Sequence, residues 1–251
     1  MSAIPRALFV HAHPDDESLW TGGTIAAHTA RGGDCDLITW TWAAGTPRHT
    51  ELSEAARALG LPREPIALGY ADSFVPESAP GATSLLDAPF DEQVAILVEQ
   101  VRRLRPDVAV TYDPFGIYGH PDHIHVNRLT CAAADAAALP HYRPDLGAPW
   151  QVESLYFITI PTSLLDLLRP HLAERSHLPT AGTPDADLHI TVDVTAQMGA
   201  KIRAITAHAT EMQRSSSMRE FSALPYEPQH RFLGWESYLR RDLVPGGVDL
   251  F

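Results

Sequence analysis

Two short segments of this sequence concentrate side chains that bind metals and move protons. The first spans residues 11–17 (His-Ala-His-Pro-Asp-Asp-Glu), and the second spans residues 112–123 and ends in His-Pro-Asp-His. A catalytic zinc ion takes three His or carboxylate ligands and leaves a fourth position for water. His13 and Asp16 are three residues apart, so one tight turn directs both side chains to a single ion. His123 supplies the third ligand from the second segment.

The same segments carry groups for the chemistry of amide hydrolysis. Asp15 adjoins a ligand but is aimed elsewhere, so it is placed to accept a proton from water activated by the metal. His120, in its cationic form, would stabilise the oxyanion of a tetrahedral intermediate and later protonate the leaving amine. Tyr118 would donate a second hydrogen bond to that oxyanion. The pattern therefore predicts a metal-dependent hydrolase.

Simpler roles exist for each motif taken alone. Asp15 and Asp16 are residue types that commonly cap the start of a helix, and His120 and His123 are equally suited to the exposed first turn of another. Capping does not account for two such motifs together, which favours the metal site.

Alternating strands and helices position these motifs. Apolar, β-branched runs predict strands over residues 6–11, 36–42, 65–70, 107–112 and 154–160. Helical spacing predicts helices over residues 18–31, 53–60, 91–105, 123–138 and 194–212. This alternation is typical of an α/β, Rossmann-like fold with a mostly parallel sheet covered by helices on both faces. Ligands bind such sheets beyond the carboxyl ends of the strands, where both motifs lie. No G-x-G-x-x-G follows the first strand, so a dinucleotide is not implied.

Composition narrows the class of protein further. The 251 residues fit one domain over residues 1–251, and Pro-rich stretches at 74–90 and 140–150, with 176–188, are expected as surface loops. The net charge of −12 argues against a nucleic-acid partner, and no apolar run of membrane-spanning length occurs. Cys35 and Cys131 are expected as buried apolar residues rather than a disulfide framework. Because no signal peptide is visible, a cytoplasmic location is expected, and a homo-oligomer stays open.

The two motifs resemble those of the LmbE-like, or PIG-L, family of zinc-dependent de-N-acetylases, which includes the mycothiol and bacillithiol deacetylases. The similarity extends to residues 48–60, 68–73 and 201–210. It implies zinc on His13, Asp16 and His123, with Asp15 as general base and His120 and Tyr118 acting on the substrate carbonyl. This chain departs from the family at Glu211, where glutamine is common, and its tail from residue 215 onward matches no particular branch.

The resemblance implies hydrolysis of the N-acetyl group of an N-acetylglucosamine conjugate, a small-molecule substrate. Arg48 and Asp72, expected in loops after the second and third strands, are candidates for binding the sugar hydroxyls. His208 is a further candidate, paired with Glu211 one helical turn away. Ferrous iron suits the ligand set as well as zinc does. Alternatives are an amidase acting on another small amide such as a thiol S-conjugate, a phosphoesterase, and a non-catalytic sugar-binding relative.

Overall fold

Seven strands form one sheet in the structure, a computed structural model that describes residues 4–171, 181–215, 220–221 and 223–251. The strands follow the order β3-β2-β1-β4-β5-β7-β6 across the sheet. Their bounds are β1 (Ala7–His11), β2 (Cys35–Thr41), β3 (Ile66–Tyr70), β4 (Val108–Tyr112), β5 (Ser154–Thr159), β6 (Ile190–Asp193) and β7 (Trp235–Asp242). The first five pair in parallel, whereas β7 runs antiparallel to both β5 and β6. The predicted Rossmann-like, mostly parallel fold is confirmed.

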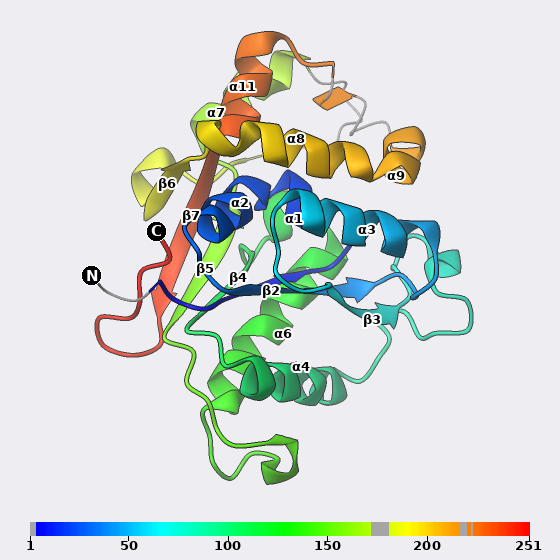
Figure 1. The fold of residues 1–251 in the computed structure, drawn as a ribbon, viewed down its shortest axis with the longest axis vertical. Coiled ribbons are helices and arrows are strands. Elements are labelled where there is room, and N and C mark those ends of the chain that lie inside the picture. Colours follow the sequence, from blue (N-terminus) through cyan, green and yellow to red (C-terminus); the bar gives the residue numbers. More distant parts are fainter. Residues whose placement is uncertain (1–3, 172–180, 216–219, 222) are drawn as a thin grey trace.

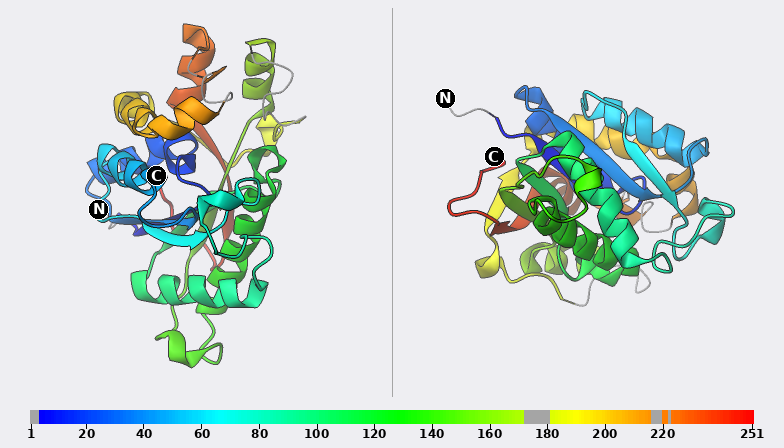
Figure 2. Two further views of the ribbon diagram at one scale, coloured as in Figure 1. Left: turned by 90° about the vertical axis from the view of Figure 1, so that its right-hand side faces the viewer. Right: turned by 90° about the horizontal axis from the view of Figure 1, so that it is seen from below.

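Helices cover both faces of this sheet (Figure 1). They are α1 (Asp16–Leu19), α2 (Gly22–Ala30), α3 (Pro47–Ala58), α4 (Phe90–Leu104), α5 (Gly116–Gly119), α6 (Pro121–Ala137), α7 (Thr162–Leu168), α8 (Met198–Ala207), α9 (Ala209–Arg214) and α11 (Tyr226–Gly234). α1, α2 and α3 lie on one face, with α8 packed on their outer side, and α4 and α6 lie together on the other (Figure 2). None of the helices in the described part of the chain has the length and apolar character that a bilayer crossing requires.

The apolar spacing of α4 shows why the predicted elements form. Its residues Val94, Leu97, Val98, Val101 and Leu104 are all buried. Burying each such side chain contributes about 1.5–3 kcal/mol, so the stripe fixes which face of the helix meets the sheet. The five parallel strands were predicted to within about one residue, and all of them except the half-buried β3 are buried along their whole length. Strands buried on both faces are continuous apolar runs, which makes them easy to predict.

Two predicted helices are broken in the structure, and one begins earlier. The helix expected over residues 18–31 divides at Thr21, whose φ of −125° lies outside the helical region. The helix expected over 194–212 breaks at His208, where ψ is 58°. α3 begins at Pro47 rather than at Ser53, because the Thr46 side chain accepts the N–H of His49 and caps the helix.

The strands β6 and β7 and the helices α7 and α11 were not predicted. The stretch expected as a loop at 74–90 does contain a short 3-10 turn at Pro76–Ser78, and part of the loop expected at 176–188 lies outside the described residues. Cys35 is buried as expected, whereas Cys131 is only half-buried.

Glu236 in β7 joins the last strand to the beginning of the chain. Its carboxylate accepts the backbone N–H groups of Gly23 at 2.8 Å and Thr24 at 2.9 Å, at the start of α2. It also accepts the ammonium of Lys201 at 2.7 Å. A Cβ on Gly23 would lie 2.3 Å from a methyl carbon of Val194, so only glycine permits this approach. The lack of a side chain at Gly23 therefore allows α2 to pack closely at this point.

Candidate metal centre and active site

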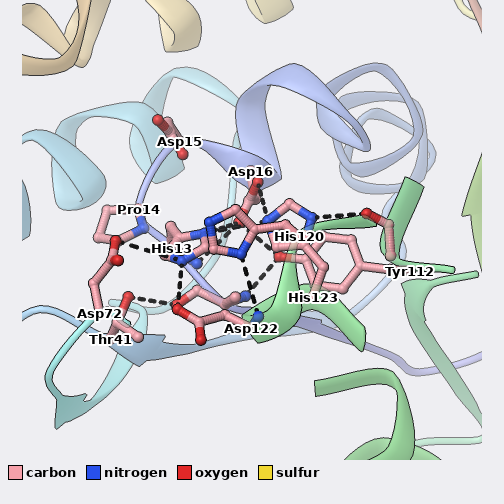
Figure 3. Close-up of polar contacts among 12 residues, drawn as sticks. His13, Pro14, Asp15, Asp16, Thr41, Asp72, Tyr112, His120, Asp122 and His123 are labelled. Atoms are coloured by element: carbon pink, nitrogen blue, oxygen red, sulfur yellow. Dashed lines mark hydrogen bonds and ion pairs between the residues drawn. The ribbon is translucent and has the colours of Figure 1, made fainter. Parts of the chain in front are cut away.

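The two motifs meet at one edge of the sheet because β1 and β4 are neighbouring parallel strands. The chain passes from β1 outward to β2 and β3, then returns to β4 on the other side of β1. This reversal of strand order leaves a crevice beyond the carboxyl ends of β1 and β4, the usual place for a ligand. Figure 3 shows the side chains of both motifs gathered there.

His13, Asp16 and His123 point toward one another at the spacing of metal ligands (Figure 3). His13 Nδ1 lies 3.2 Å from Asp16 Oδ2 and 3.2 Å from His123 Nε2, and His123 Nε2 lies 3.4 Å from Asp16 Oδ1. Ligand atoms about 2.0–2.2 Å from a tetrahedral zinc ion stand roughly 3.3–3.6 Å from one another. The three residues therefore fit a single divalent ion.

The far nitrogens of both imidazoles have acceptors that fix the required tautomers. His13 Nε2 lies 3.1 Å from Asp122 Oδ2, and His123 Nδ1 lies 3.3 Å from the carbonyl oxygen of Gly116. With a proton donated on each far nitrogen, the lone pairs of the near nitrogens are left for a metal. Such outer contacts orient and strengthen metal-ligating histidines.

Tyr112, the last residue of β4, supports two of the three ligands. Its hydroxyl donates to Asp16 Oδ2 at 2.6 Å and accepts the backbone N–H of Ala12 at 2.6 Å. Its ring stacks on that of His123 with the centroids 4.0 Å apart. Burial raises the pKa of Tyr112 well above its usual range, so the hydroxyl keeps the proton that it donates.

Two other groups of side chains at this edge have spacings that a metal would accept. His120 joins His13 and His123 in one, and Asp72 and Asp122 join His13 in the other. The second group uses the Nε2 side of His13, which already has Asp122 as hydrogen-bond acceptor at 3.1 Å. The cluster with Asp16 is therefore the better centre, because it uses both imidazoles with their tautomers fixed.

Asp15 lies to one side of this cluster in a strained conformation (Figure 3). Its backbone φ angle is 122°. Residues other than glycine rarely adopt such a value, and those that do are commonly found at functional positions. Its backbone N–H donates to Glu17 Oε2 at 2.9 Å, and its carboxylate lies 3.2 Å from Arg48 Nη2. Burial raises the pKa of Asp15 to about 7, although the Arg48 guanidinium acts in the opposite direction. A carboxyl with this pKa exchanges protons readily near neutral pH.

His120 sits beside the metal ligands as a neutral hydrogen-bond donor. Its ring centroid is 4.7 Å from that of His13, and its Nδ1 accepts the backbone N–H of Asp122 at 3.2 Å. Burial, with His13 close by, lowers the pKa of His120 to about 2. Nδ1 therefore carries no proton and Nε2–H remains as the donor. The structure thus favours a neutral imidazole over the cation that the sequence analysis invoked.

The loop that carries Tyr118 is also strained, and Asp113 holds it. Asp113 Oδ1 accepts the backbone N–H groups of Phe115 and Ile117, each at 3.0 Å, while Ile117 has a φ of 66°. The Tyr118 ring centroid lies 5.2 Å from that of His123. Burial raises the pKa of Tyr118 well above its usual range, so its phenol stays protonated.

The three predicted substrate-binding residues all lie near this edge, but their contacts differ from those expected. Arg48 is in the first turn of α3 rather than in a loop, and it is 3% exposed. Its Nη groups donate to Glu211 and to the carbonyl oxygen of Pro14. Asp72 follows β3 as predicted, with Oδ2 3.5 Å from His13 Nε2.

His208 does not pair with Glu211 as the sequence analysis expected. Its Nε2 instead lies 2.7 Å from Glu17 Oε1, and both side chains are fully buried. Glu211 binds Arg48 and Arg214. The break between α8 and α9 at His208 explains the difference, because the two residues do not share one continuous helix face.

Sequence reasoning gave no role to Tyr112, Glu17 or Asp122. Tyr112 ends a buried strand and is the first residue of the second motif, which is a usable signal, since polar groups at strand ends face the crevice. Glu17 and Asp122 belong to the motifs themselves. Their partners, Asp15 N–H, His208 and His13, become apparent only in three dimensions.

Fold and site together define an α/β protein with a histidine–carboxylate cluster, a candidate metal centre, at the switch point of its sheet. The PIG-L family, described as GlcNAc-PI de-N-acetylase, matches residues 8–134. This chain belongs to that family, which confirms the resemblance drawn from the two motifs.

Curated relatives cover nearly the whole chain. A 1D-myo-inositol 2-acetamido-2-deoxy-alpha-D-glucopyranoside deacetylase from Rhodococcus jostii is 39% identical over 86% of this chain and 85% of its own. The enzyme of the same name from Mycobacterium leprae is 35% identical over 99% of both chains. The chain is thus similar to enzymes that hydrolyse an amide bond.

Solved structures share the fold. A conserved protein from Thermus thermophilus has a TM-score of 0.66 and 25% identity, covering 98% of this chain and all of its own. The N,N'-diacetylchitobiose deacetylase of Pyrococcus horikoshii has a TM-score of 0.66 at 18% identity, covering 95% of this chain and 84% of its own. A 4-carboxy-2-hydroxymuconate hydratase from Pseudomonas putida has a TM-score of 0.59 at 17% identity, covering 98% of both. The fold alone therefore does not decide the reaction.

Proposed function

We propose that this protein is a metal-dependent hydrolase that removes the N-acetyl group from a small N-acetylglucosamine-type conjugate. The observation that carries the proposal is the approach of His13, Asp16 and His123 ligand atoms to 3.2–3.4 Å beside a half-buried, strained Asp15. The naming of the most similar curated relatives as deacetylases of an inositol conjugate of acetylated glucosamine supports the substrate class.

His13, Asp16 and His123 would hold the metal, and zinc is the ion we propose. A bound divalent ion would polarise the acetyl carbonyl and lower the pKa of water toward about 7. Ferrous iron is accommodated by the same nitrogen and oxygen donors, so metal analysis is needed to distinguish the two. Asp122 and Tyr112 keep the ligands oriented in either case.

Asp15 acts as the proton carrier of the reaction. It accepts a proton as water oxygen bonds to the acetyl carbon, and it returns that proton to the amine nitrogen as the carbon–nitrogen bond breaks. The products are acetate and the free amino sugar. A pKa near 7 suits a group that must first accept and then release a proton at neutral pH.

His120 and Tyr118 stabilise the negative charge that develops on the carbonyl oxygen. His120 donates through Nε2–H, because its Nδ1 accepts the N–H of Asp122. Tyr118 donates its phenolic proton from the strained loop after β4. Removing one such donor typically costs about 10²–10³ in rate.

Asp72 is the residue that we propose for binding a sugar hydroxyl. Arg48 serves mainly to orient the Asp15 carboxylate, since its Nη groups already have acceptors. His208 acts through Glu17 rather than by touching the sugar.

The wider setting of the enzyme is also proposed. Residues 1–251 act as one catalytic domain, a proposal supported by a single sheet that takes strands from Ala7 to Asp242. The net negative charge of the chain, and the small-molecule substrate named for its relatives, favour a cytoplasmic enzyme without nucleic-acid or membrane partners. Self-association is to be measured directly, for example by light scattering.

Other reactions make different experimental predictions. An amidase acting on a thiol S-conjugate would release an amine together with an acid other than acetate, and a phosphoesterase would release phosphate and commonly bind two metals. A sugar-binding relative would release nothing. A hydratase, the activity of one structural neighbour, would release neither acetate nor amine.

The decisive experiment is an amine- and acetate-release screen on metal-reconstituted protein. The panel contains N-acetylglucosaminyl inositol, diacetylchitobiose and free N-acetylglucosamine. We expect equal yields of acetate and amine, one metal per chain, loss of activity with a chelator and recovery with zinc. The matched variant Asp15→Asn should keep its metal and lose at least about a hundredfold in rate. Full activity in Asp15→Asn, or in the chelated protein, would contradict the proposal.

A further inference from the structure

Phe74 is an exposed aromatic side chain beside the candidate site. It lies in the loop after β3 and is 67% exposed, more than any other phenylalanine in the described part of the chain. A single apolar side chain at the surface is ordinary, so exposure alone assigns no role. Phe74 differs from other exposed residues in how its backbone is held and in which side chains surround it.

Two carboxylates of the site fix the turn that carries Phe74. Asp72 Oδ1 accepts the backbone N–H of Phe74 at 2.8 Å. The preceding residue, Ser73, donates its backbone N–H to Asp122 Oδ2 at 3.1 Å and its hydroxyl to Asp122 Oδ1. The same Asp122 carboxylate meets His13 Nε2 at 3.1 Å. The Phe74 backbone is therefore held in place relative to a proposed metal ligand, and little backbone freedom is left to lose when a substrate binds.

The ring of Phe74 borders the place that the substrate must occupy. Its centroid lies 4.8 Å from that of His120, with an angle of 67° between the ring planes. His120 is the proposed donor to the acetyl carbonyl, and Asp72 is the residue proposed for binding a sugar hydroxyl. Because the acetamide nitrogen is bonded directly to a carbon of the sugar ring, a substrate held by both residues has its ring beside Phe74.

The chemistry of a pyranose ring suits this position. Its hydroxyl groups lie around the edge of the ring, whereas its faces present carbon–hydrogen bonds. Ligand sites combine apolar and aromatic walls with a few polar groups that fix orientation. Here Phe74 supplies an aromatic wall and Asp72 a polar group. An acyclic amide offers an acetamide and a hydroxyl but no face to cover the phenyl ring.

We propose that Phe74 binds the substrate by packing on the apolar face of its sugar ring. This contact makes the enzyme selective for acetamides of cyclic sugars over acyclic acetamides. It favours binding because apolar surface of the phenyl ring and of the sugar is removed from water together. The inference rests on the proposed deacetylase function and adds a binding residue to it.

The first test compares a cyclic with an acyclic substrate of the metal-loaded wild-type enzyme. Methyl N-acetylglucosaminide contains the sugar ring, and N-acetylethanolamine contains an acetamide and a hydroxyl without a ring. The value of kcat/KM for the sugar should exceed that for the acyclic amide by at least about tenfold. Comparable values would overturn the selectivity. If the wild type hydrolyses no N-acetylated sugar, the proposed function itself fails, which is a separate outcome.

Phe74→Ala tests the residue itself. We expect KM for the sugar to rise about tenfold with kcat within about twofold of the wild-type value, because a contact made equally in the bound substrate and in the transition state changes KM alone. Phe74→Tyr keeps the aromatic face and should keep KM within about threefold of the wild-type value. A fall in kcat at unchanged KM would show that Phe74 acts by orienting His120, and it would refute binding of the sugar ring.

Product inhibition measures binding of the ring without the chemical step. The inhibition constant of methyl glucosaminide, the deacetylated product, should rise about tenfold in Phe74→Ala. An unchanged constant would contradict the proposal. Both Phe74 variants should keep the wild-type metal content and urea unfolding curve, because the side chain is exposed.

Phe90→Ala is the matched control. Phe90 is 38% exposed, and its ring lies 5.7 Å from that of His125, a histidine outside both groups of side chains with metal-ligand spacing. This variant should keep the wild-type KM and inhibition constant. The same rise in Phe90→Ala would assign the effect to a general loss of surface aromatic side chains and refute a specific role for Phe74.

Discussion

Glu17 and Asp15 are joined by a hydrogen bond in which the backbone N–H of Asp15 donates to Glu17 Oε2 at 2.9 Å. The other oxygen of the same carboxylate meets His208 Nε2 at 2.7 Å and the Ser18 hydroxyl at 2.5 Å. Asp15 has an unfavourable backbone φ angle of 122°, and this hydrogen bond stabilises it in that conformation. Glu17 is therefore placed to position Asp15, the proton carrier that we propose.

Replacing Glu17 should lower the rate without removing the metal. In Glu17→Ala we expect kcat to fall at least about tenfold and the acidic limb of the pH–rate profile to move, because Asp15 loses its fixed place. Glu17→Gln should recover most of kcat, since its amide oxygen still accepts the Asp15 N–H. Removing one partner of a buried pair also costs about 3–5 kcal/mol of stability, so kinetics are measured well below the melting temperature. Equal kcat values in the two variants would speak against positioning.

Tyr112→Phe should weaken metal binding. The lost hydroxyl donates to Asp16 Oδ2 at 2.6 Å, and removal of such an outer contact typically lowers metal affinity about 10–100-fold. Competition with a chelating dye measures the dissociation constant. Tyr156→Phe is the control, because the Tyr156 hydroxyl donates to Asp249, away from the site. Unchanged metal affinity in Tyr112→Phe would show that Asp16 is oriented by other contacts.

Gly116→Ala should displace the His123 side chain and so weaken metal binding. Gly116 has a φ of +67°, and a Cβ there would lie 2.8 Å from the Cβ of His123. Backbone strain alone costs about 1–3 kcal/mol. Gly32→Ala is matched for strain, since Gly32 has a φ of +83° with nothing within 4 Å of its added Cβ. Both variants should lose stability in urea unfolding, but only Gly116→Ala should lose metal. Retention of metal by both would place the loop further from His123 than described.

His28 should make stability fall in mild acid. Burial lowers the pKa of His28 below its usual 6.5, and its Nδ1 has no hydrogen-bond partner among the described residues. The unfolded chain therefore binds a proton near pH 6.5 that the folded chain refuses. The free energy of unfolding thus declines as pH falls below about 6.5, by up to about 1.4 kcal/mol per pH unit from this group.

Urea unfolding at pH 7.5 and 5.0, in chelator so that metal loss does not contribute, measures this effect. His28→Gln should lose less stability than the wild type between the two pH values. The same substitution at exposed His141 should leave the difference unchanged. A wild-type decline identical to that of His28→Gln would assign the acid sensitivity to other groups.

The sequence predicted the elements whose patterns are local. The strand at Val108–Tyr112 is an unbroken apolar run, and α4 repeats its apolar residues at helical spacing. β7 was missed because it contains three charged residues in its last three positions and a buried Glu236. That carboxylate is tolerated inside only because Lys201 and the start of α2 pair with it, and such pairing cannot be seen in a one-dimensional pattern.

The candidate site likewise contains features that the sequence predicts and features that appear only in the folded protein. The positions of His13, Asp16 and His123 follow from motif spacing and from the rule that parallel strands end at one edge. The protonation of His120 depends on the backbone N–H of Asp122, two residues along the chain, whereas the contacts of Arg48 depend on the carboxylate of Glu211, from a distant segment. These contacts favour a neutral donor at His120, and they turn the Nη groups of Arg48 toward Asp15, Pro14 and Glu211.

The bond between Glu236 and the start of α2 has a consequence for how the protein is made. The two partners, Gly23 and Glu236, are 213 residues apart in the chain. At roughly 5–20 residues per second, a ribosome needs roughly 10–40 s to travel that distance. During that interval the growing chain exposes the start of α2 without Glu236, and β5, once it has been made, lacks its antiparallel neighbour. The nascent protein therefore cannot complete its native sheet until β7 has left the ribosome, and until then the open edge of β5 is available for pairing with other chains.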